Sequence, residues 1–188
     1  MSRTGAHTPP ILGLILAAGG STRMGRPKAL LHHGGRPLIA GHVAALSTVC
    51  ASVRAVLGGH GAAIDAALPP EVRRIWNLDW ERTGMSDSLA LGLADLDAEA
   101  MVLMTPVDLP PAPEAVLRAL IGAGAPAVPT WSGRTGHPVL LVAGPTRVAL
   151  RTSPLDQALA EARRVEVDWA ETLANLNTPA DWEALRRG

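Results

Sequence analysis

Residues Leu14–Leu31 read LILAAGGSTRMGRPKALL, an aliphatic run that leads into a glycine-rich turn with three cationic side chains. A buried strand feeding a loop of small residues is typical of α/β proteins that hold phosphate groups beyond the end of the first strand. The loop matches neither the P-loop pattern GxxxxGK(S/T) nor the dinucleotide pattern GxGxxG. It therefore predicts an α/β sheet with an anion site of another kind.

Lys28 is the only lysine among the 17 lysine and arginine residues of the chain. An ammonium is a compact point charge that fits between phosphate oxygens, whereas a guanidinium is a wide planar fork. Chance survival in an arginine-rich composition is the alternative. The position of Lys28 inside the glycine-rich loop favours a phosphate contact, with Arg23 adding charge and the small residues Ala17–Gly20 exposing backbone N–H groups.

The overall composition limits the function classes. A length of 188 residues predicts a single domain, which we expect to span 11–188 after a flexible N-terminus at 1–10. A net charge of +0 provides no overall field for nucleic acid or an anionic membrane, and no apolar stretch reaches the length of a membrane span. The single cysteine, Cys50, excludes a disulfide within the chain, predicts a core residue and indicates a cytoplasmic protein.

Apolar runs and helical patterns alternate along the chain. We expect strands at 11–17, 52–57, 72–76, 100–105, 125–130, 138–142 and 164–167. We expect helices at 38–50, with Pro37 in its first turn, and at 58–68, 86–96, 113–123, 155–162 and 179–187. This alternation predicts a three-layer, doubly wound, mostly parallel Rossmann-like sheet, whose ligands gather at the carboxyl ends of the strands.

Asp108 follows the predicted strand at 100–105 in the turn TPVDLP. A carboxylate at the carboxyl end of a strand is well placed to hold Mg²⁺ against substrate phosphates. The alternative is that Asp108 caps the helix that begins near Pro113. The position at the strand end favours the metal role.

A second polar segment, NLNTPAD, lies near the C-terminus. Thr178 is expected to cap a helix that has Pro179 at its first position and Asp181 at its third. Asn175 and Asn177 alternate on the extended segment before this helix, where one of them could give a carbonyl oxygen to the metal. The capping role does not depend on the metal role.

Two further segments carry polar candidates. Asn77, Ser86 and Ser88 precede or begin a helix, where a serine could cap the helix or present N–H groups to an anion. His137 lies in the turn RTGHPV and could bind substrate, although a loop histidine is more often solvated or structural.

The motifs, taken in order, resemble those of the molybdenum cofactor nucleotidyltransferases, a branch of the nucleotide-diphospho-sugar transferase-like superfamily. LAAGGSTRMGRPKALL is similar to the family signature LAAGxSxRMGxxKxLL. Further similar motifs are Asn77…Trp80…Gly84-Met85…Ser88-Leu89…Gly92-Leu93, Asp108-Leu109-Pro110, Gly136-His137-Pro138-Val139 and Asn177-Thr178-Pro179…Asp181. The resemblance covers the chain from Ile11 onward.

The resemblance implies a role for each matching position. The first loop would grip the nucleoside triphosphate, Lys28 would contact phosphate, and Asp108 would bind Mg²⁺. The implied nucleotide-binding residues are Leu16, Ala17, Ala18, Gly19, Gly20, Ser21, Met24, Gly25, Lys28, Asn77, Ser86 and Ser88. The implied catalytic residues are Arg23, Lys28 and Asp108, the metal ligands are Asp108, Asn175 and Asn177, and the acceptor-binding residues are Gly136, His137 and Pro138.

The opening Ala17-Ala18-Gly19 and the Gly-His-Pro turn are more similar to the cytidylyl branch than to the guanylyl branch, which implies CTP and molybdopterin as substrates. Four segments depart from the family pattern. Asp108-Leu109-Pro110 stands where Asp-Gln-Pro is common, and the segment before Gly84 is slightly longer than usual. Thr152–Gln157 stands where Gly-Asp-x-Gly is expected, and Asn175 and Asn177 stand where the cytidylyl branch often has aspartate.

The implied reaction is attack of a phosphorylated acceptor on the α-phosphorus of a nucleoside triphosphate, with release of pyrophosphate. A phosphate acceptor needs no general base, so catalysis would rest on positioning and charge neutralisation. The alternatives are GTP or another nucleotide, another phosphate acceptor, or a non-catalytic nucleotide-binding accessory that serves a molybdoenzyme or its chaperone. A dinucleotide-dependent oxidoreductase is disfavoured because no GxGxxG follows the first strand.

Overall fold

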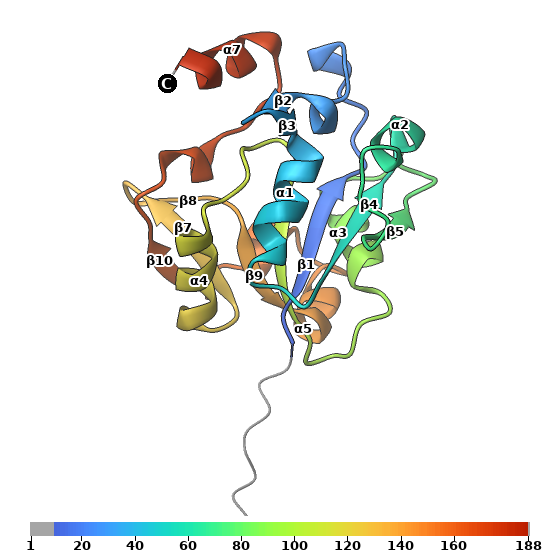
Figure 1. Cartoon of the computed structure of the whole chain (residues 1–188). Helices are drawn as coiled ribbons and strands as arrows, with labels where there is room; N and C mark the ends of the chain where they lie inside the picture. The colour runs from blue at the N-terminus through green and yellow to red at the C-terminus, as the bar shows by residue number, and fades with distance from the viewer. Residues whose placement is uncertain (1–9, 188) are drawn as a thin grey trace, which may run out of the picture.

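The computed structural model describes residues 10–187 and is organised around one mixed β-sheet (Figure 1). The strands are β1 (Leu12–Ala17), β4 (Ser52–Leu57), β5 (Arg73–Trp76), β6 (Met101–Pro106), β7 (Ala127–Trp131), β8 (Arg134–Thr135), β9 (Val139–Val142) and β10 (Arg163–Glu166). Their order is β10-β7-β9-β6-β1-β4-β5, with β8 paired to β7. β1 pairs in parallel with both β4 and β6, so the first loop leaves from the middle of the sheet.

β1 is central because both of its faces are apolar. Leu14 and Leu16 pack into one hydrophobic cluster, whereas Ile15 and Ala17 pack into the cluster on the opposite face. Alternate residues of a strand point to opposite faces, so a continuous apolar run fits a strand covered on both sides. The run therefore becomes a buried central strand.

Helices cover both faces of the sheet and give three layers. They are α1 (Leu38–Ser47), α2 (Gly61–Asp65), α3 (Met85–Leu93), α4 (Glu114–Ala123), α5 (Ala143–Ala149), α6 (Leu155–Ala158) and α7 (Pro179–Arg187). α1 and α4 contribute to one cluster, and α3, α5 and α6 contribute to the other. The prediction of a three-layer, mostly parallel α/β fold is confirmed.

Several helices are shorter than predicted: α1 ends at Ser47 and α3 at Leu93, while α2 and α6 span only Gly61–Asp65 and Leu155–Ala158. α1 begins after Pro37, which is its N-cap and not part of its first turn. α2 does not begin at Gly58 because the glycines before it pair with the loop after β1, where Gly59 N donates to Ala18 O at 2.8 Å. Helix boundaries are set here by tertiary contacts that the sequence pattern does not encode.

Several short elements were not predicted at all. α5 begins AGP, a poor helix signal, yet its Arg147 Nη1 donates to Leu93 O and Leu96 O, both at 2.7 Å. A two-stranded hairpin of β2 (His32–His33) and β3 (Arg36–Pro37) precedes α1. The 3-10 helices η1 (Thr22–Met24), η2 (Lys28–Leu30) and η3 (Ala170–Leu173) were also missed. β9 runs antiparallel to β6, a direction that an apolar run cannot reveal.

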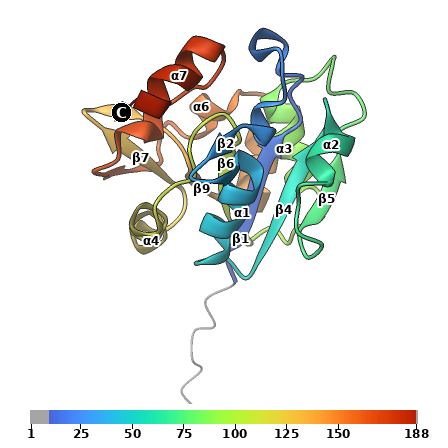
Figure 2. The same cartoon turned by 45° about the horizontal axis from the view of Figure 1, so that its top comes forward.

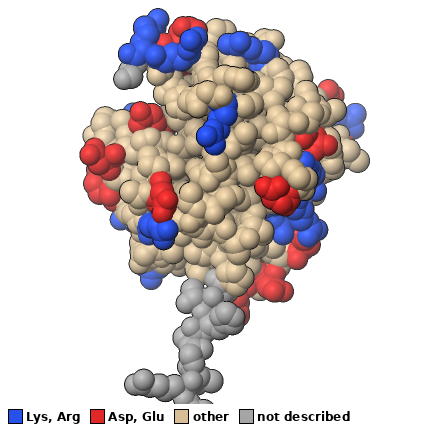
Figure 3. Space-filling model, in the orientation of Figure 1, with Lys and Arg blue, Asp and Glu red and all other residues tan. Residues whose placement is uncertain are grey.

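The predicted flexible segment 1–10 lies outside the described residues except for Pro10, which is exposed. Within residues 10–187, none of the helices has the length and apolar character needed to cross a membrane. Figure 3 shows acidic and basic side chains interspersed over one face of the molecule, in keeping with the net charge of +0.

Candidate active site

The carboxyl ends of β1 and β6 border a cavity of about 220 Å³. Val107 N donates to Leu16 O at 3.1 Å, so the segments at the ends of β1 and β6 stay paired where they leave the sheet. The cavity is lined by Leu16, Ala18, Gly19, Ser21, Lys28, Trp80, Thr83, Gly84, Met85, Ser88, Pro106, Val107 and Asp108. Figure 2 brings this end of the sheet forward, with the first loop and α7 both lying there. The nucleotide-loop and metal candidates therefore meet at one edge of the sheet, as predicted from topology.

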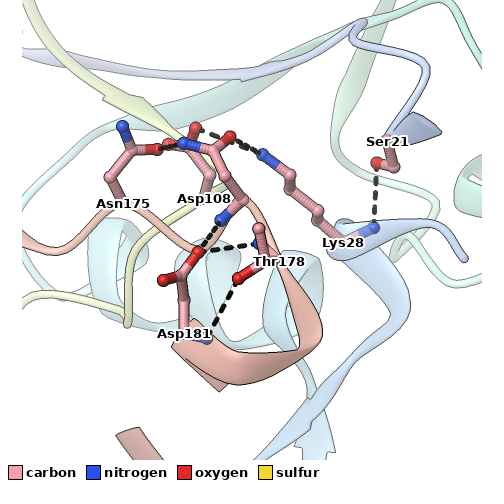
Figure 4. Close-up of polar contacts among 7 residues, drawn as sticks. Ser21, Lys28, Asp108, Asn175, Thr178 and Asp181 are labelled. Carbon is pink, nitrogen blue, oxygen red and sulfur yellow. Dashed lines mark hydrogen bonds and ion pairs between the residues drawn. The ribbon is translucent and has the colours of Figure 1, made fainter. Parts of the chain in front are cut away.

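Lys28 lines this cavity, and Figure 4 shows its polar contacts with Ser21 and with the group that includes Asp108. Its Nζ donates to Asn177 Oδ1 at 2.6 Å and lies 3.6 Å from Asp108 Oδ2, while its backbone N–H donates to Ser21 Oγ at 3.1 Å. The Lys28 side chain is only 14% exposed. An ammonium has three hydrogens, so Lys28 can keep the Asn177 bond and still donate to a phosphate.

The segment before α7 is tied to the turn that carries Asp108. Leu176 N donates to Asp108 O at 2.7 Å, and Asn177 Nδ2 donates to Asn175 Oδ1. Both asparagine carbonyl oxygens thus accept one bond, and each retains a second lone pair. Asp108, Asn175 and Asn177 are brought together, as predicted for the metal candidates.

The predicted cap of α7 is confirmed. Thr178 N and Asn177 N donate to Asp181 Oδ2 at 2.7 and 3.0 Å, and Asp181 N donates to Thr178 Oγ1 at 3.3 Å. The hydrogen bonds from Thr178 are the main cause of a lowered pKa of Asp181. α7 is further anchored by Trp182, which is 3% exposed. The cap holds Asn177 in place next to Lys28.

Trp80 forms one wall of the cavity and packs on glycines in the two loops that follow β1 and β4. A Cβ added to Gly20 would lie 2.6 Å from Trp80 Cζ3, and one added to Gly58 would lie 2.7 Å from Trp80 Cβ. Gly59 would meet the Gly20 backbone at 2.7 Å. These glycines are required because the indole and the two loops approach one another closely.

The predicted nucleotide-binding residues separate into two groups. Six line the cavity, namely Leu16, Ala18, Gly19, Ser21, Lys28 and Ser88. Ala17 and Met24 belong to the hydrophobic core on the opposite face of the sheet, and Gly20 lies beneath Trp80. Arg23 and Gly25 are exposed and lie outside the cavity lining, with Gly25 at φ +70° as the C-cap of η1. The remaining two, Asn77 and Ser86, also lie outside this lining.

Asn77 is buried behind the cavity wall. Its Nδ2 donates to Thr83 Oγ1 at 2.8 Å and to Ser88 Oγ at 3.1 Å, and its Oδ1 accepts from Asp79 N at 3.1 Å. Both amide hydrogens are therefore engaged within the protein. Asn77 shapes the loop that carries Trp80 and Thr83.

The helix cap proposed for Ser86 or Ser88 is wrong. Gly84 is the N-cap of α3, and Gly84 N donates to Asp87 Oδ2 at 2.8 Å. A glycine can occupy this position in extended conformation while a third-position carboxylate satisfies its N–H. Asp108 does not cap α4 either, because Pro113 is the N-cap of that helix.

Two further cavities, of about 330 and 270 Å³, are both lined by His137. Both are lined by Met85, Thr135 and Gly136, and Met85 also lines the cavity that contains Lys28 and Asp108. The larger is lined mainly by apolar residues and includes Ser86, whereas the smaller reaches Asp108, Asn175 and Arg134. The clefts are thus continuous with the site of Lys28 and Asp108.

The Gly136–Pro138 turn is held by hydrogen bonds to Thr172, which precedes Asn175 and Asn177 in the chain. His137 N donates to Thr172 O at 3.0 Å, Thr172 Oγ1 donates to His137 O at 2.8 Å, and a Cβ on Gly136 would lie 2.2 Å from Thr172 O. Burial lowers the pKa of His137, and the nearby Asp108 charge opposes this effect. Pro138 lines neither cleft and instead borders a small interior cavity together with His42.

Sequence reasoning did not name several lining residues as site candidates, among them Trp80, Thr83, Met85 and Arg134. Trp80 is one of five tryptophans and follows Asn77 within the motif, so its spacing carried a signal. Met85 belongs to the same motif, but an exposed methionine does not by itself indicate a binding role. The single thiol is only partly buried and packs against the hydrophobic core, and burial raises the pKa of Cys50 to about 12.

The donor set at Asp108 fits a hard cation that is held jointly with substrate. Within residues 10–187, no group of three or more His, Cys, Asp or Glu side chains could hold a metal by itself. Mg²⁺ is commonly held by one or two carboxylates together with phosphates and water. Asp108 with the amide oxygens of Asn175 and Asn177 matches this pattern.

The geometry agrees with the comparisons to known proteins. A model of the MobA-like NTP transferase domain matches residues 13–171. A probable molybdenum cofactor guanylyltransferase of Rhodopirellula baltica is 38% identical over 108 residues, which cover 56% of this chain and 51% of that protein. A nicotine blue oxidoreductase of Paenarthrobacter nicotinovorans is 37% identical over 105 residues, covering 54% and 51%. The chain thus spans about half the length of these curated relatives.

Among solved structures, Rv0371c from Mycobacterium tuberculosis H37Rv superposes with a TM-score of 0.80 at 22% identity, covering 96% of this chain and 99% of that one. A manganese complex of the same protein superposes with a TM-score of 0.75, covering 95% and 99%. At this identity the likeness establishes the fold, and the domain match establishes the family. The chain belongs to the MobA-like NTP transferase domain family.

Proposed function

We propose that this chain is a Mg²⁺-dependent nucleotidyltransferase that transfers CMP from CTP to the terminal phosphate of molybdopterin and releases pyrophosphate. The observation that carries the proposal is the convergence of Lys28, Asp108 and Asn177 beside the cavity that Lys28 and Asp108 line at the carboxyl ends of β1 and β6. The family match and the likeness to a probable molybdenum cofactor guanylyltransferase support the same reaction class.

In the proposed reaction, an acceptor phosphate oxygen forms a bond to the α-phosphorus, and the bond from the α-phosphorus to the pyrophosphate oxygen breaks. The nucleophile is already anionic, so none of the protein's side chains has to remove a proton. Lys28 would donate to the phosphate oxygens on which charge accumulates, while the backbone of Ala18, Gly19 and Ser21 would hold the triphosphate. Arg23 would add positive charge from the loop surface.

Asp108 would hold the cation, with Asn175 and Asn177 able to add amide oxygens. A bound divalent ion would neutralise phosphate charge and favour departure of pyrophosphate. The fixed backbone of the Asp108 turn keeps the carboxylate beside Lys28, 3.6 Å from Nζ. Positioning and charge neutralisation are then the main sources of catalysis.

The acceptor would occupy the clefts around His137. The cleft that reaches Asp108 and Arg134 is suited to a phosphate, and the apolar cleft beyond His137 is suited to a flat ring system. Gly136 and His137 would line the passage between them. The choice of CTP over GTP rests on the Ala17-Ala18-Gly19 opening of the loop and its resemblance to the cytidylyl branch.

The decisive experiment measures pyrophosphate release from each of the four nucleoside triphosphates, with and without molybdopterin. Release with CTP and molybdopterin together supports the proposal. Release with GTP indicates the guanylyl alternative. Release with other phosphate compounds in place of molybdopterin indicates a different acceptor. A nucleotide that binds without pyrophosphate release under all conditions indicates a non-catalytic accessory of a molybdoenzyme or its chaperone.

The relative named as an oxidoreductase calls for one control. NADH and NADPH oxidation should be followed at the same protein concentration, and we expect none.

A cytoplasmic location is proposed as well, supported by the single cysteine.

A further inference from the structure

His42 is a buried histidine for which the proposed mechanism has no use. It lies in α1 on the face toward the sheet, is 2% exposed, and has its Nε2 3.0 Å from Leu109 O. A carbonyl oxygen can only accept, so Nε2 must carry the hydrogen. Burial lowers the pKa of His42 to about 4, so at neutral pH the ring is the neutral tautomer with Nε2 as its donor.

The carbonyl that accepts this bond belongs to the turn that carries Asp108. Val107–Pro113 has no helix or strand structure, and prolines at 110, 111 and 113 remove three backbone donors from it. The turn therefore depends on donors from elsewhere. Leu176 N supplies one at Asp108 O, and His42 supplies the next at Leu109 O.

α1 packs closely enough to act as a platform for this turn. A Cβ added to Gly41 would lie 2.7 Å from Pro111 Cγ, so the glycine beside His42 lets the helix backbone approach the proline pair. Leu109 itself is 1% exposed and cannot replace its lost donor with bulk water. The same interior cavity that His42 borders, of about 10 Å³, is bordered by Pro138 of the acceptor turn.

We propose that His42 is a positioning residue for the cation site: its Nε2–H fixes the Leu109 carbonyl and thereby holds the Asp108 carboxylate beside Lys28. The inference rests on the proposed role of Asp108. Groups that orient a metal ligand typically contribute ~10–100-fold to metal affinity. His42 acts through the backbone and touches neither substrate nor cation.

Three variants separate this role from simple packing. His42→Gln keeps a donor at about the reach of Nε2, His42→Asn has the same amide but stops short of Leu109, and His42→Leu removes the donor. Mn²⁺ binding to the full chain in the presence of CTP is measured by electron paramagnetic resonance, and CTP binding is measured with EDTA present. Thermal unfolding of each variant is recorded in parallel.

We expect His42→Asn and His42→Leu to weaken Mn²⁺ binding ~10-fold or more, while His42→Gln stays within about twofold of the original chain. CTP binding in EDTA should be unchanged in all three. If His42→Leu does not fold, the matched Gln and Asn pair still decides. Equal Mn²⁺ affinity in these two, whatever their thermal stability, would overturn the proposal.

Asp108→Asn distinguishes the failure of this inference from failure of the proposed function. Loss of Mn²⁺ binding in Asp108→Asn, with no effect of His42→Asn, would overturn only the positioning role. Unchanged Mn²⁺ binding in Asp108→Asn would instead show that the cation site has been assigned to the wrong residue, and both proposals would fall.

Discussion

The Lys28 ammonium donates a 2.6 Å hydrogen bond to Asn177 Oδ1, although the two residues are 149 positions apart in the chain. This bond joins the first loop to the segment that begins α7. Because Asn177 is itself held by the Thr178 and Asp181 cap, the C-terminal helix fixes the direction of the Lys28 side chain. The first loop and the segment before α7 therefore contribute to one site.

Removing this contact should slow transfer without unfolding the protein. We expect Asn177→Ala to lower kcat about tenfold, because Lys28 loses its orienting partner and must be ordered during the reaction. Asn175 accepts from Asn177 and not from Lys28, so at saturating Mg²⁺ Asn175→Ala should lower kcat less. Steady-state kinetics with CTP and molybdopterin compare the two, and an equal loss in both would argue against the orienting role of Asn177.

Replacing the lysine itself should be more damaging. We expect Lys28→Ala to lower the transfer rate by ~10² or more with folding intact, because its charge would stabilise phosphate oxygens in the transition state. Circular dichroism confirms the fold, and pyrophosphate release gives the rate. Near-original turnover would exclude Lys28 as a catalytic residue.

The exposed arginines of the same loop form a matched pair. Arg23 and Arg26 both lie outside the cavity lining, and only Arg23 is assigned a catalytic role. If that assignment holds, Arg23→Ala lowers kcat several-fold while Arg26→Ala does not, since a fixed charge acts only near the triphosphate. Equal rates for the two variants, measured at low and high salt, would remove Arg23 from the site.

The sequence was sufficient to predict the parts of the site that follow strand ends. The apolar run of β1, the aspartate after β6 and the rule that parallel strands end at one edge placed Lys28 and Asp108 together. Local capping chemistry also predicted the Thr178 and Asp181 contacts. These features depend on short stretches of chain whose physical preferences agree with the fold.

Other features depend on contacts between distant segments and could not be read from a pattern. Met24 and Gly20 stand in the signature loop, yet one packs in the core and the other lies under Trp80. Asn77 was predicted to bind the nucleotide, but its Nδ2 donates both hydrogens within the protein, to Thr83 and Ser88. A motif identifies which residues belong together, and packing decides which of them face the ligand.

A glycine pair tests how tightly the acceptor turn is packed. Gly136→Ala should destabilise the protein by about 1–3 kcal/mol, because the added methyl would meet Thr172 O, which accepts from His137 N. Gly122→Ala, in α4 with open space around its added methyl, should instead stabilise by about 0.5–1 kcal/mol. Urea unfolding measures both, and a neutral Gly136→Ala would mean that the turn can shift without cost.

The buried ring of His42 should make stability depend on pH. Because its folded pKa of about 4 lies below the usual 6.5, the unfolded chain binds the proton first as the pH falls, and stability decreases between these values. From about pH 7 to about pH 5 the expected loss from His42 is about 2 kcal/mol. His42→Gln cannot titrate and should lose less by that amount, while the lowered pKa of His137 acts in the same direction in both proteins. Urea unfolding at the two pH values measures the difference, and equal losses in the two proteins would show that His42 keeps its ordinary pKa in the fold.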